Sequence, residues 1–211
     1  MNEALALHEL GALGAILRGH FVFTSGKHGG MYINKDAVYP HTRETHRFCM
    51  AIAGRFGEDR VDTVIAPAIG GVILSQWTAH YLSVLRACEV YGVYAEKADP
   101  AGTAFVIKRG YDKFIAGKRV LVVEDVLNTG GSVRKVVDAV REIGGAVIGI
   151  GALCNRGGVT AQDVGDVPKL TALVNVAFDA WDEADCPLCR NGVPVNTDVG
   201  KGREYLARKR A

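Results

Sequence analysis

The sequence predicts an α/β fold in which helices cover both faces of a central parallel sheet. Continuous apolar runs such as "VLVV" (120–123) and "AVIGIGAL" (146–153) alternate along the chain with segments of helical periodicity. Strands buried on both faces have this composition, and their alternation with helices is typical of parallel sheets. Ligands of such folds bind outside the carboxyl ends of the strands. The loops at those ends are therefore the first places to look for a site.

The composition predicts one globular domain that works in a reducing compartment. The chain has 211 residues, of which 48% are hydrophobic and 23% charged, and its net charge of +2 gives no footprint for nucleic acid. No apolar run approaches the roughly 18 residues of a membrane span, and the N-terminus lacks the pattern of a signal peptide. Five irregularly spaced cysteines do not form a disulfide framework, so we expect a cytoplasmic protein.

The first half of the chain yields six elements. A helix is expected over 3–18, ending at Gly19, because five apolar residues recur near helical spacing. The segment "HFVFTSGKHGGMYIN" (20–34) predicts two strands around a glycine turn. A helix over 42–56 follows Pro40, and "DTVIAPAIGG" (62–71) is a buried strand that enters a glycine loop before a helix over 72–85.

The second half continues the alternation. Two strands, 90–97 and 104–110, flank a polar tip, and a fully buried strand is expected over 118–125. A helix begins at Ser132, because valines recur at i, i+3, i+4 and i+7. Strands over 146–155 and 170–178 complete the sheet, and the tail from Asp179 is polar.

Two carboxylates stand where the strand over 118–125 ends. A buried strand that ends in Glu124 and Asp125 is costly unless a ligand or metal meets these acids. The following loop supplies hydroxyls, glycines and the free N–H groups of a helix start, which suit a phosphate. The acids suit the hydroxyls of a sugar. A solvated turn capped by Ser132 is the alternative, and neither a P-loop nor a dinucleotide-binding motif is present.

"VLVVEDVLNTGGS" resembles the phosphoribosyl pyrophosphate (PRPP) signature of type I phosphoribosyltransferases. The resemblance extends over most of the chain and points within that family to the branch that acts on orotate. It implies a single domain with a hood from roughly 1–40 plus part of 170–211, Mg²⁺ as cofactor and a homodimer. The implied reaction transfers a 5-phosphoribosyl group from PRPP to orotate and releases pyrophosphate. The partners are then small molecules, with neither nucleic acid nor membrane.

The resemblance also assigns roles to individual positions. Glu124 and Asp125 lie near the Mg²⁺, which is held through ligand and water. Cations at the proposed lid would stabilise the leaving pyrophosphate: Lys97, Lys108 and Arg109. PRPP is bound by two loops: Pro67, Ala68, Ile69, Gly70, Gly71, and Val126, Leu127, Asn128, Thr129, Gly130, Gly131, Ser132. The base is bound by Ser25, Gly26, Lys27 and Arg156, whose planar guanidinium suits a carboxylate.

Several positions depart from the pattern of the orotate branch. Gly70 and Thr24 stand where those enzymes have lysine, and the segment 98–109 contains no histidine. These departures leave open a purine or another pyrimidine as the acceptor. A PRPP-binding regulator of transcription is a further alternative, disfavoured because the first helix is mostly apolar.

A Cys-x-x-Cys pair, Cys186 and Cys189, has the spacing of half a zinc site. No second pair of ligands follows it, and the sequence does not show whether Cys154 approaches. The sequence therefore favours a packed or reduced turn over a metal site. His28 is expected in a solvated turn, and the basic tail "ARKRA" is expected to be solvated.

Overall fold

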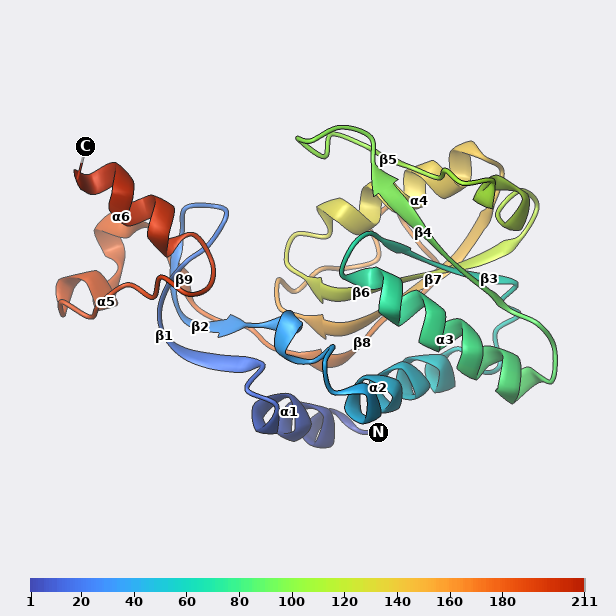
Figure 1. The fold of residues 1–211 in the computed structure, drawn as a ribbon, viewed down its shortest axis with the longest axis horizontal. Helices are drawn as coiled ribbons and strands as arrows, with labels where there is room; N and C mark the ends of the chain where they lie inside the picture. The colour runs from blue at the N-terminus through green and yellow to red at the C-terminus, as the bar shows by residue number, and fades with distance from the viewer. Residues whose placement is uncertain (211) are drawn as a thin grey trace. The chain divides into compact units, whose positions relative to one another are not determined.

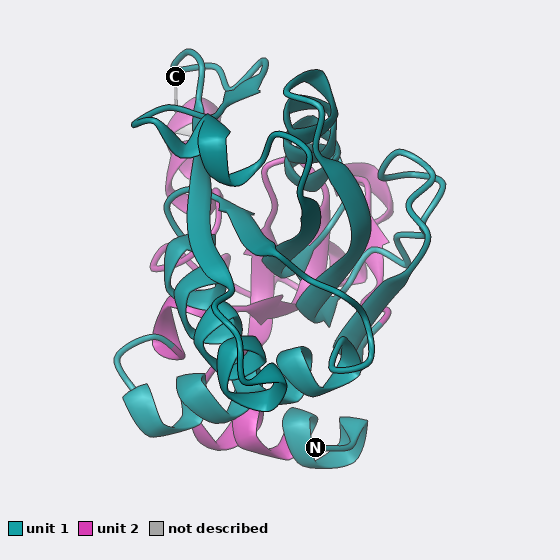
Figure 2. Ribbon diagram, turned by 90° about the vertical axis from the view of Figure 1, so that its right-hand side faces the viewer, with its two compact units in different colours: residues 1–7, 39–176 teal, residues 8–38, 177–211 magenta. Residues whose placement is uncertain are grey.

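The computed structural model describes residues 1–210 (Figure 1). The chain divides into two compact units, coloured separately in Figure 2: residues 1–7 with 39–176, and residues 8–38 with 177–211. We refer to them as the larger and the smaller unit. The division between residues 7 and 8 falls within the helix α1 (Glu3–Ala12). The hood expected from the sequence, 1–40 plus part of 170–211, overlaps the smaller unit, although residues 1–7 belong to the larger one.

The larger unit is built on a six-stranded sheet in the order β5-β4-β3-β6-β7-β8. All neighbouring strands are parallel except β5, which runs antiparallel to β4. The α/β class and the parallel sheet predicted from the sequence are therefore confirmed. The strands are β3 (Thr63–Pro67), β4 (Tyr91–Lys97), β5 (Phe105–Val106), β6 (Arg119–Leu127), β7 (Ala146–Asn155) and β8 (Leu170–Asn175).

Helices cover both faces of this sheet. The helices α2 (Thr42–Arg55) and α3 (Gly71–Arg86) pack on each other and on one face, and α4 (Gly131–Glu142) covers the other (Figure 1). The four valines of α4 that recur at helical spacing are buried in the core with residues of β3 and β6. On the opposite face of the sheet, a glycine of β7 leaves room for the ring of Phe56. A Cβ at Gly149 would lie 2.8 Å from that ring. Residues 150 and 152 of the same strand face the α4 side.

The smaller unit is a three-stranded sheet in the order β1-β2-β9, with β1 (Ile16–Val22), β2 (His28–Ile33) and β9 (Ala180–Trp181). The tail adds α5 (Pro187–Arg190) and α6 (Gly202–Arg210). Residues 195–201 run beside β1, where the N–H of Asn196 donates to the carbonyl of His20 and that of Lys201 to the carbonyl of Val22. Phe21 and Val22 are fully buried. The two ends of the chain thus form one unit.

The structure corrects several expectations drawn from the sequence. The first helix ends at Ala12, because Gly14 adopts a left-handed φ of 68° and the chain continues as β1. Its last two apolar residues therefore belong to a strand. The strand expected over 104–110 is only two residues long. β6 continues to Leu127, two residues beyond its predicted end. His28, expected in a solvated turn, is fully buried at the start of β2.

Candidate active site at the carboxyl ends of β3, β4, β6 and β7

Four loops follow the carboxyl ends of adjacent parallel strands, so they lie at the same end of the sheet. They are residues 68–70 after β3, 98–104 after β4, 128–130 after β6 and 156–158 after β7. β6 pairs with β3 only as far as Val122 and runs five residues further. Its end, with both acids, is therefore paired with β7 alone. This is the edge at which parallel α/β sheets bind their ligands.

The two carboxylates are buried, with Glu124 8% and Asp125 3% exposed. Backbone amides accommodate part of the charge, because Asp125 N–H donates to Glu124 Oε1 at 3.0 Å and Val126 N–H to Asp125 Oδ1 at 2.7 Å. The hydroxyl of Tyr39 donates to Asp125 Oδ2 at 3.0 Å. The acids are thus fixed in place at the end of the strand before any ligand arrives, which favours a site that needs preorganised oxygen acceptors.

The ionisation of Tyr39 is coupled to the carboxylate of Asp125. Its pKa is raised first by burial and then by the neighbouring Asp125 carboxylate, which also accepts its hydrogen bond. Tyr39 therefore stays protonated in the folded chain at pH values at which an unfolded tyrosine, with a pKa of about 10, has ionised. Because the folded pKa is raised, this stabilisation is complete below about pH 10 and is lost as the pH rises further.

We predict that the free energy of unfolding falls more steeply above about pH 10 in the wild type than in Tyr39→Phe. The difference in slope is at most about 1.4 kcal/mol per pH unit, the value for one proton. Urea unfolding of both proteins between about pH 9 and about pH 11 measures it. Equal slopes would show that Tyr39 does not remain protonated beside Asp125.

The loop after β6 has the form of an anion cradle. The N-cap of α4 is Gly130, which has no side chain with which to cap the first turn. Its φ is 74°, and a Cβ there would lie 2.6 Å from Val164 Cγ1, so both backbone and packing require glycine. Thr129 and Ser132 are exposed at the loop. Ser132 is the second helical residue, so the alternative in which it caps the helix is wrong.

Two residues of the predicted loop belong to β6 instead. Leu127 is buried in the core, and its carbonyl accepts the N–H groups of Arg156 and Gly157 at 2.9 and 3.1 Å. Val126 is half-buried and paired with Cys154 of β7. The side chain of Leu127 thus points into the protein, and the exposed part of the loop begins at Asn128.

The segment after β7 supports the cradle. Asn155 is buried, and its side chain bridges the segment, donating to Val159 O at 2.9 Å and accepting from Val159 N–H at 3.0 Å. Arg156 Nη1 donates to Asn128 Oδ1 at 3.3 Å. A Cβ on Gly157 would lie 1.5 Å from the carbonyl oxygen of Asn128, so the two backbones touch. Arg156 is therefore held beside the loop that follows β6.

The loop after β3 leads directly into α3. Ala68 and Ile69 are joined by a cis peptide bond, and the side chain of Ile69 is 89% exposed. Gly70 is the N-cap of α3, so the first N–H groups of that helix adjoin the loop. A Cβ on Gly71 would lie 2.5 Å from Ala66 Cβ, which explains the glycine. Pro67 is the last residue of the strand and is buried.

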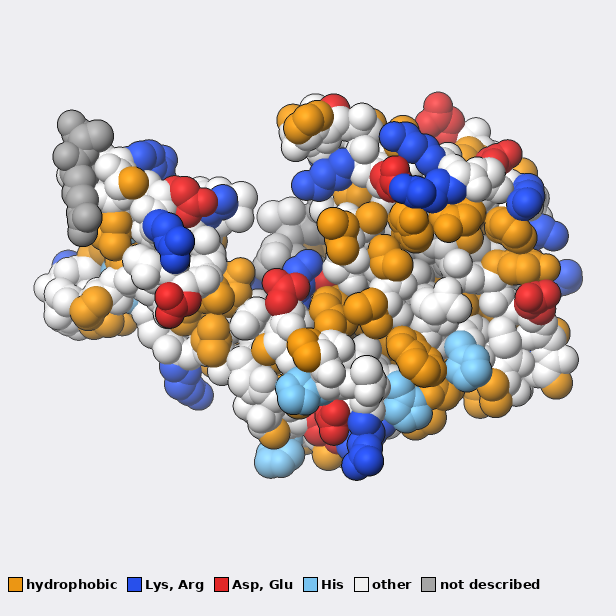
Figure 3. Space-filling view, in the orientation of Figure 1, with side chains coloured by type: hydrophobic (Ala, Val, Ile, Leu, Met, Phe, Trp, Pro, Cys, Tyr) orange, Lys and Arg blue, Asp and Glu red, His pale blue; other side chains and the backbone are white. Residues whose placement is uncertain are grey.

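Two of the three cations expected at a lid, Lys108 and Arg109, are paired with an acid at the base of the β4–β5 hairpin. Glu96 forms an ion pair with Arg109 at 2.6 Å and lies 3.9 Å from Lys108 Nζ. In the space-filling view, the part of the larger unit where this hairpin projects carries both blue and red side chains (Figure 3). Lys97 is exposed, and its aliphatic stem passes over Gly102 at the hairpin tip. Lys135 of α4 donates to the carbonyl of Gly102.

The remaining predicted residues, Ser25, Gly26 and Lys27, lie in the turn between β1 and β2 of the smaller unit. Gly26 has a φ of 82°. The backbone N–H of Lys27 donates to Ser25 Oγ at 3.4 Å, and the side-chain ammonium of Lys27 lies 3.7 Å from Asp182 Oδ1. All three are exposed.

Sequence analysis missed three supporting residues. Tyr39 lies 86 positions before the carboxylate that it contacts, so no local pattern reveals it. Glu96 pairs with Lys108 and Arg109 across the hairpin, and no local pattern indicates that pairing. Asn155 offered a weak signal, because an amide at the end of a buried strand requires partners.

The fold and these loops define a phosphoribosyltransferase. Residues 43–182 match the family described as the phosphoribosyl transferase domain, and the chain belongs to that family. The resemblance noted in the sequence is therefore confirmed.

Among the described residues, no helix is long and apolar enough to cross a membrane.

The chain is similar to curated orotate phosphoribosyltransferases. It is 40% identical to that of Pelotomaculum thermopropionicum over 86% of this chain and 89% of the relative. Identity to that of Chlorobium phaeobacteroides is 34% over 97% and 99% of the two chains. The crystal structure of the orotate phosphoribosyltransferase from Aeropyrum pernix superposes with a TM-score of 0.61, at 25% identity over 81% of this chain and 93% of that one.

Proposed function

We propose that this protein is an orotate phosphoribosyltransferase, which transfers the 5-phosphoribosyl group of PRPP to orotate and releases pyrophosphate. The observation that carries the proposal is the pair of buried, preorganised carboxylates between two glycine loops at one edge of the sheet. The curated relatives that bear this name cover nearly the whole chain. Identities of 34–40% extend through the segments that hold these loops.

The phosphate and the ribose are assigned to the end of β6. The 5′-phosphate would accept hydrogen bonds from the loop Asn128–Ser132 and the first turn of α4. The ribose hydroxyls would donate to Glu124 and Asp125. Fixing both ends of the phosphoribosyl group sets the position of C1′, which converts a bimolecular encounter into an oriented reaction.

The pyrophosphate is assigned to Pro67–Gly71 and to the lid cations Lys97, Lys108 and Arg109. The bond between C1′ and the pyrophosphate oxygen breaks as the base nitrogen bonds to C1′, and both electrons leave with pyrophosphate. Positive charge placed at the departing oxygens lowers the barrier. Lys108 and Arg109 would exchange Glu96 for pyrophosphate, and closure of the hairpin would exclude water.

The family resemblance implies Mg²⁺, and the donors present fit it. Mg²⁺ prefers oxygen ligands and is commonly held by one or two carboxylates together with substrate phosphates. Glu124 and Asp125, directly or through water, would hold the ion beside the sugar. When bound, the ion neutralises charge on the pyrophosphate leaving group. We also propose, from the resemblance, a homodimer, a hood role for the smaller unit, and base contacts from Ser25, Gly26 and Lys27.

The proposal is tested by pyrophosphate release with Mg²⁺ and PRPP in the presence of orotate, uracil, hypoxanthine, xanthine or adenine. We expect orotate to give the highest kcat/KM. A purine or uracil as the best acceptor would replace orotate but keep the reaction, consistent with the glycine at position 70 and threonine at position 24. PRPP binding without turnover of any base would favour a regulatory protein.

Arg156 is expected to recognise the carboxylate of the base. Because a charge-assisted hydrogen bond contributes about 1.5–3 kcal/mol, Arg156→Gln should raise the KM for orotate by roughly 10- to 100-fold. The KM for PRPP should change less, although Arg156 also contacts Asn128. Steady-state kinetics with each substrate varied in turn measure both. The control is Arg134→Gln, whose guanidinium is exposed on α4 and pairs with Asp138. Equal effects on both KM values would instead assign Arg156 to the phosphate loop.

A further inference from the structure

Four potential metal ligands gather within the smaller unit, in a cluster that the proposed reaction does not use. They are His20 of β1, His28 of β2, and Cys186 and Cys189 at the two ends of the first turn of α5. One ligand atom from each lies within 4.8 Å of all the others. The sequence showed only the Cys-x-x-Cys half, because the histidines that complete it precede it by more than 150 positions.

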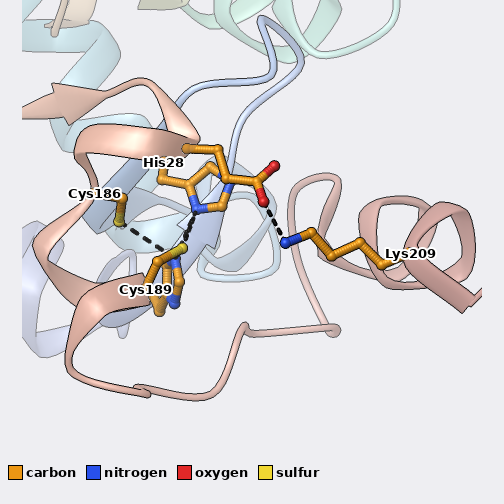
Figure 4. Close-up of polar contacts among 6 residues, drawn as sticks. His28, Cys186, Cys189 and Lys209 are labelled. Atoms are coloured by element: carbon orange, nitrogen blue, oxygen red, sulfur yellow. Dashed lines mark hydrogen bonds and ion pairs between the residues drawn. The ribbon is translucent and has the colours of Figure 1, made fainter.

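The distances among these atoms fit one tetrahedral ion. His20 Nε2 lies 3.7 Å from Sγ of each cysteine, and His28 Nδ1 lies 3.3 Å from Cys189 Sγ. Zinc bonds of about 2.0–2.1 Å to nitrogen and about 2.3 Å to sulfur place tetrahedral N and S donors roughly 3.6 Å apart. The two ring nitrogens are 2.8 Å apart, so they would separate by about half an ångström around the ion. Figure 4 shows the sulfur atoms and the ring of His28 facing one another.

A hydrogen bond on the far side of the ring from the cluster fixes the tautomer of His20 that can bind a metal. Its Nδ1 lies 2.7 Å from the carbonyl oxygen of Val193, which can only accept, so Nδ1 carries the proton. Nε2 of a neutral His20 therefore presents a lone pair to the cluster. A backbone carbonyl behind the ring is the usual arrangement for a metal-bound histidine, because it fixes the tautomer and the ring orientation.

Burial makes this cluster costly without an ion. His28 and Cys186 are fully buried and His20 is 2% exposed. The ring of His28 also meets that of Tyr205 edge to face. Two thiolates and a divalent cation are together neutral, which suits an enclosed position. Four protein ligands leave no open coordination position, so the site is structural rather than catalytic.

We propose that His20, His28, Cys186 and Cys189 bind one Zn²⁺ ion that joins the two ends of the chain. Two cysteines and two histidines in tetrahedral arrangement select zinc among common divalent ions, and the short spacing of the ligand atoms fits a single ion rather than an iron–sulfur cluster. The link is needed where the sheet is weakest, because β9 pairs with β2 through only two residues. Lys209 of α6, which is labelled in Figure 4, forms a separate ion pair with Glu183, three residues before Cys186.

The first test is the metal content of the full chain, expressed without a histidine tag in zinc-supplemented medium and dialysed before elemental analysis. We expect about one zinc per chain. The double variant Cys186→Ser/Cys189→Ser and the single variant His28→Gln should each lose it. The matched control, Cys88→Ser, removes an exposed cysteine of the larger unit and should keep the full content. Zinc that persists in the double variant would place the metal elsewhere and overturn the proposal.

A second measurement remains decisive if the variants fail to fold. Wild-type protein stripped of metal under reducing conditions is titrated with Co²⁺, which should give visible bands of a tetrahedral ion and near-ultraviolet thiolate charge transfer. Equimolar Zn²⁺ should abolish both and raise the Tm by more than about 10 °C, because metal binding is coupled to folding. A Cys186–Cys189 disulfide in freshly purified protein, or wild-type protein that binds neither ion, would overturn the proposal. These readouts do not depend on turnover of any base.

Discussion

Replacing Asp125 by Asn is expected to lower kcat/KM for PRPP by about 10²-fold or more. The substitution removes a negative charge from the site proposed to hold the ribose hydroxyls and Mg²⁺. It also replaces one acceptor oxygen by a donor. In the wild-type protein, Asp125 accepts a hydrogen bond from Tyr39 through one oxygen and from Val126 N–H through the other. An amide can satisfy only one of these donors.

The same substitution should therefore cost some stability, about 1–3 kcal/mol for the donor left without an acceptor. Steady-state pyrophosphate release and urea unfolding, measured side by side, separate the two effects. The control is Asp138→Asn, which alters an exposed acid of α4 paired with Arg134 and should change neither activity nor stability appreciably. A folded Asp125→Asn protein with wild-type turnover would remove the carboxylate pair from the mechanism.

Adding a single methyl group at Gly157 is expected to disturb the phosphate loop strongly. A Cβ there would lie 1.5 Å from the carbonyl oxygen of Asn128, and a backbone atom cannot move aside without displacing its loop. Gly157→Ala should lower the free energy of unfolding by about 2 kcal/mol or more. It should raise the KM for PRPP at least tenfold, because Asn128 begins the segment proposed to hold the 5′-phosphate.

The matched control is Gly54→Ala. Gly54 lies in α2, where nothing lies within 4 Å of an added Cβ, and alanine is a better helix former by up to about 1 kcal/mol. That variant should be unchanged in kinetics and slightly more stable. Thermal unfolding and PRPP-dependent kinetics of the three proteins give the comparison. If Gly157→Ala matched the wild type in both, the contact between the two loops would have no part in the site.

Local pattern predicted most of the larger unit. The helix α2 and the strand β7 were placed within a residue of their observed bounds, because each has a continuous periodicity and a clear stop. The prediction failed at α1, where apolar residues of a helix and of the following strand happen to continue one spacing. It also failed in the tail, where α6 is a polar helix with little pattern of its own.

The chemistry that we propose for the site was indicated in part by local sequence as well. Glu124, Asp125 and the glycines around Gly130 are contiguous, so their spacing alone indicated a sugar beside a phosphate. The pairing of Glu96 with Lys108 and Arg109 was not visible, because it depends on the register of the hairpin. Tyr39 behind Asp125 was hidden for the same reason, since only folding brings it near.

The sequence by itself determined the alternation of strands and helices, the family, and the loop that follows β6, since each is encoded in residues that are neighbours along the chain. The tertiary structure decided which distant residues meet. It buried His28, which a local reading placed in water, and set it with His20 beside Cys186 and Cys189. Such contacts form between segments that are far apart in the sequence, and short-range periodicity contains no information about them.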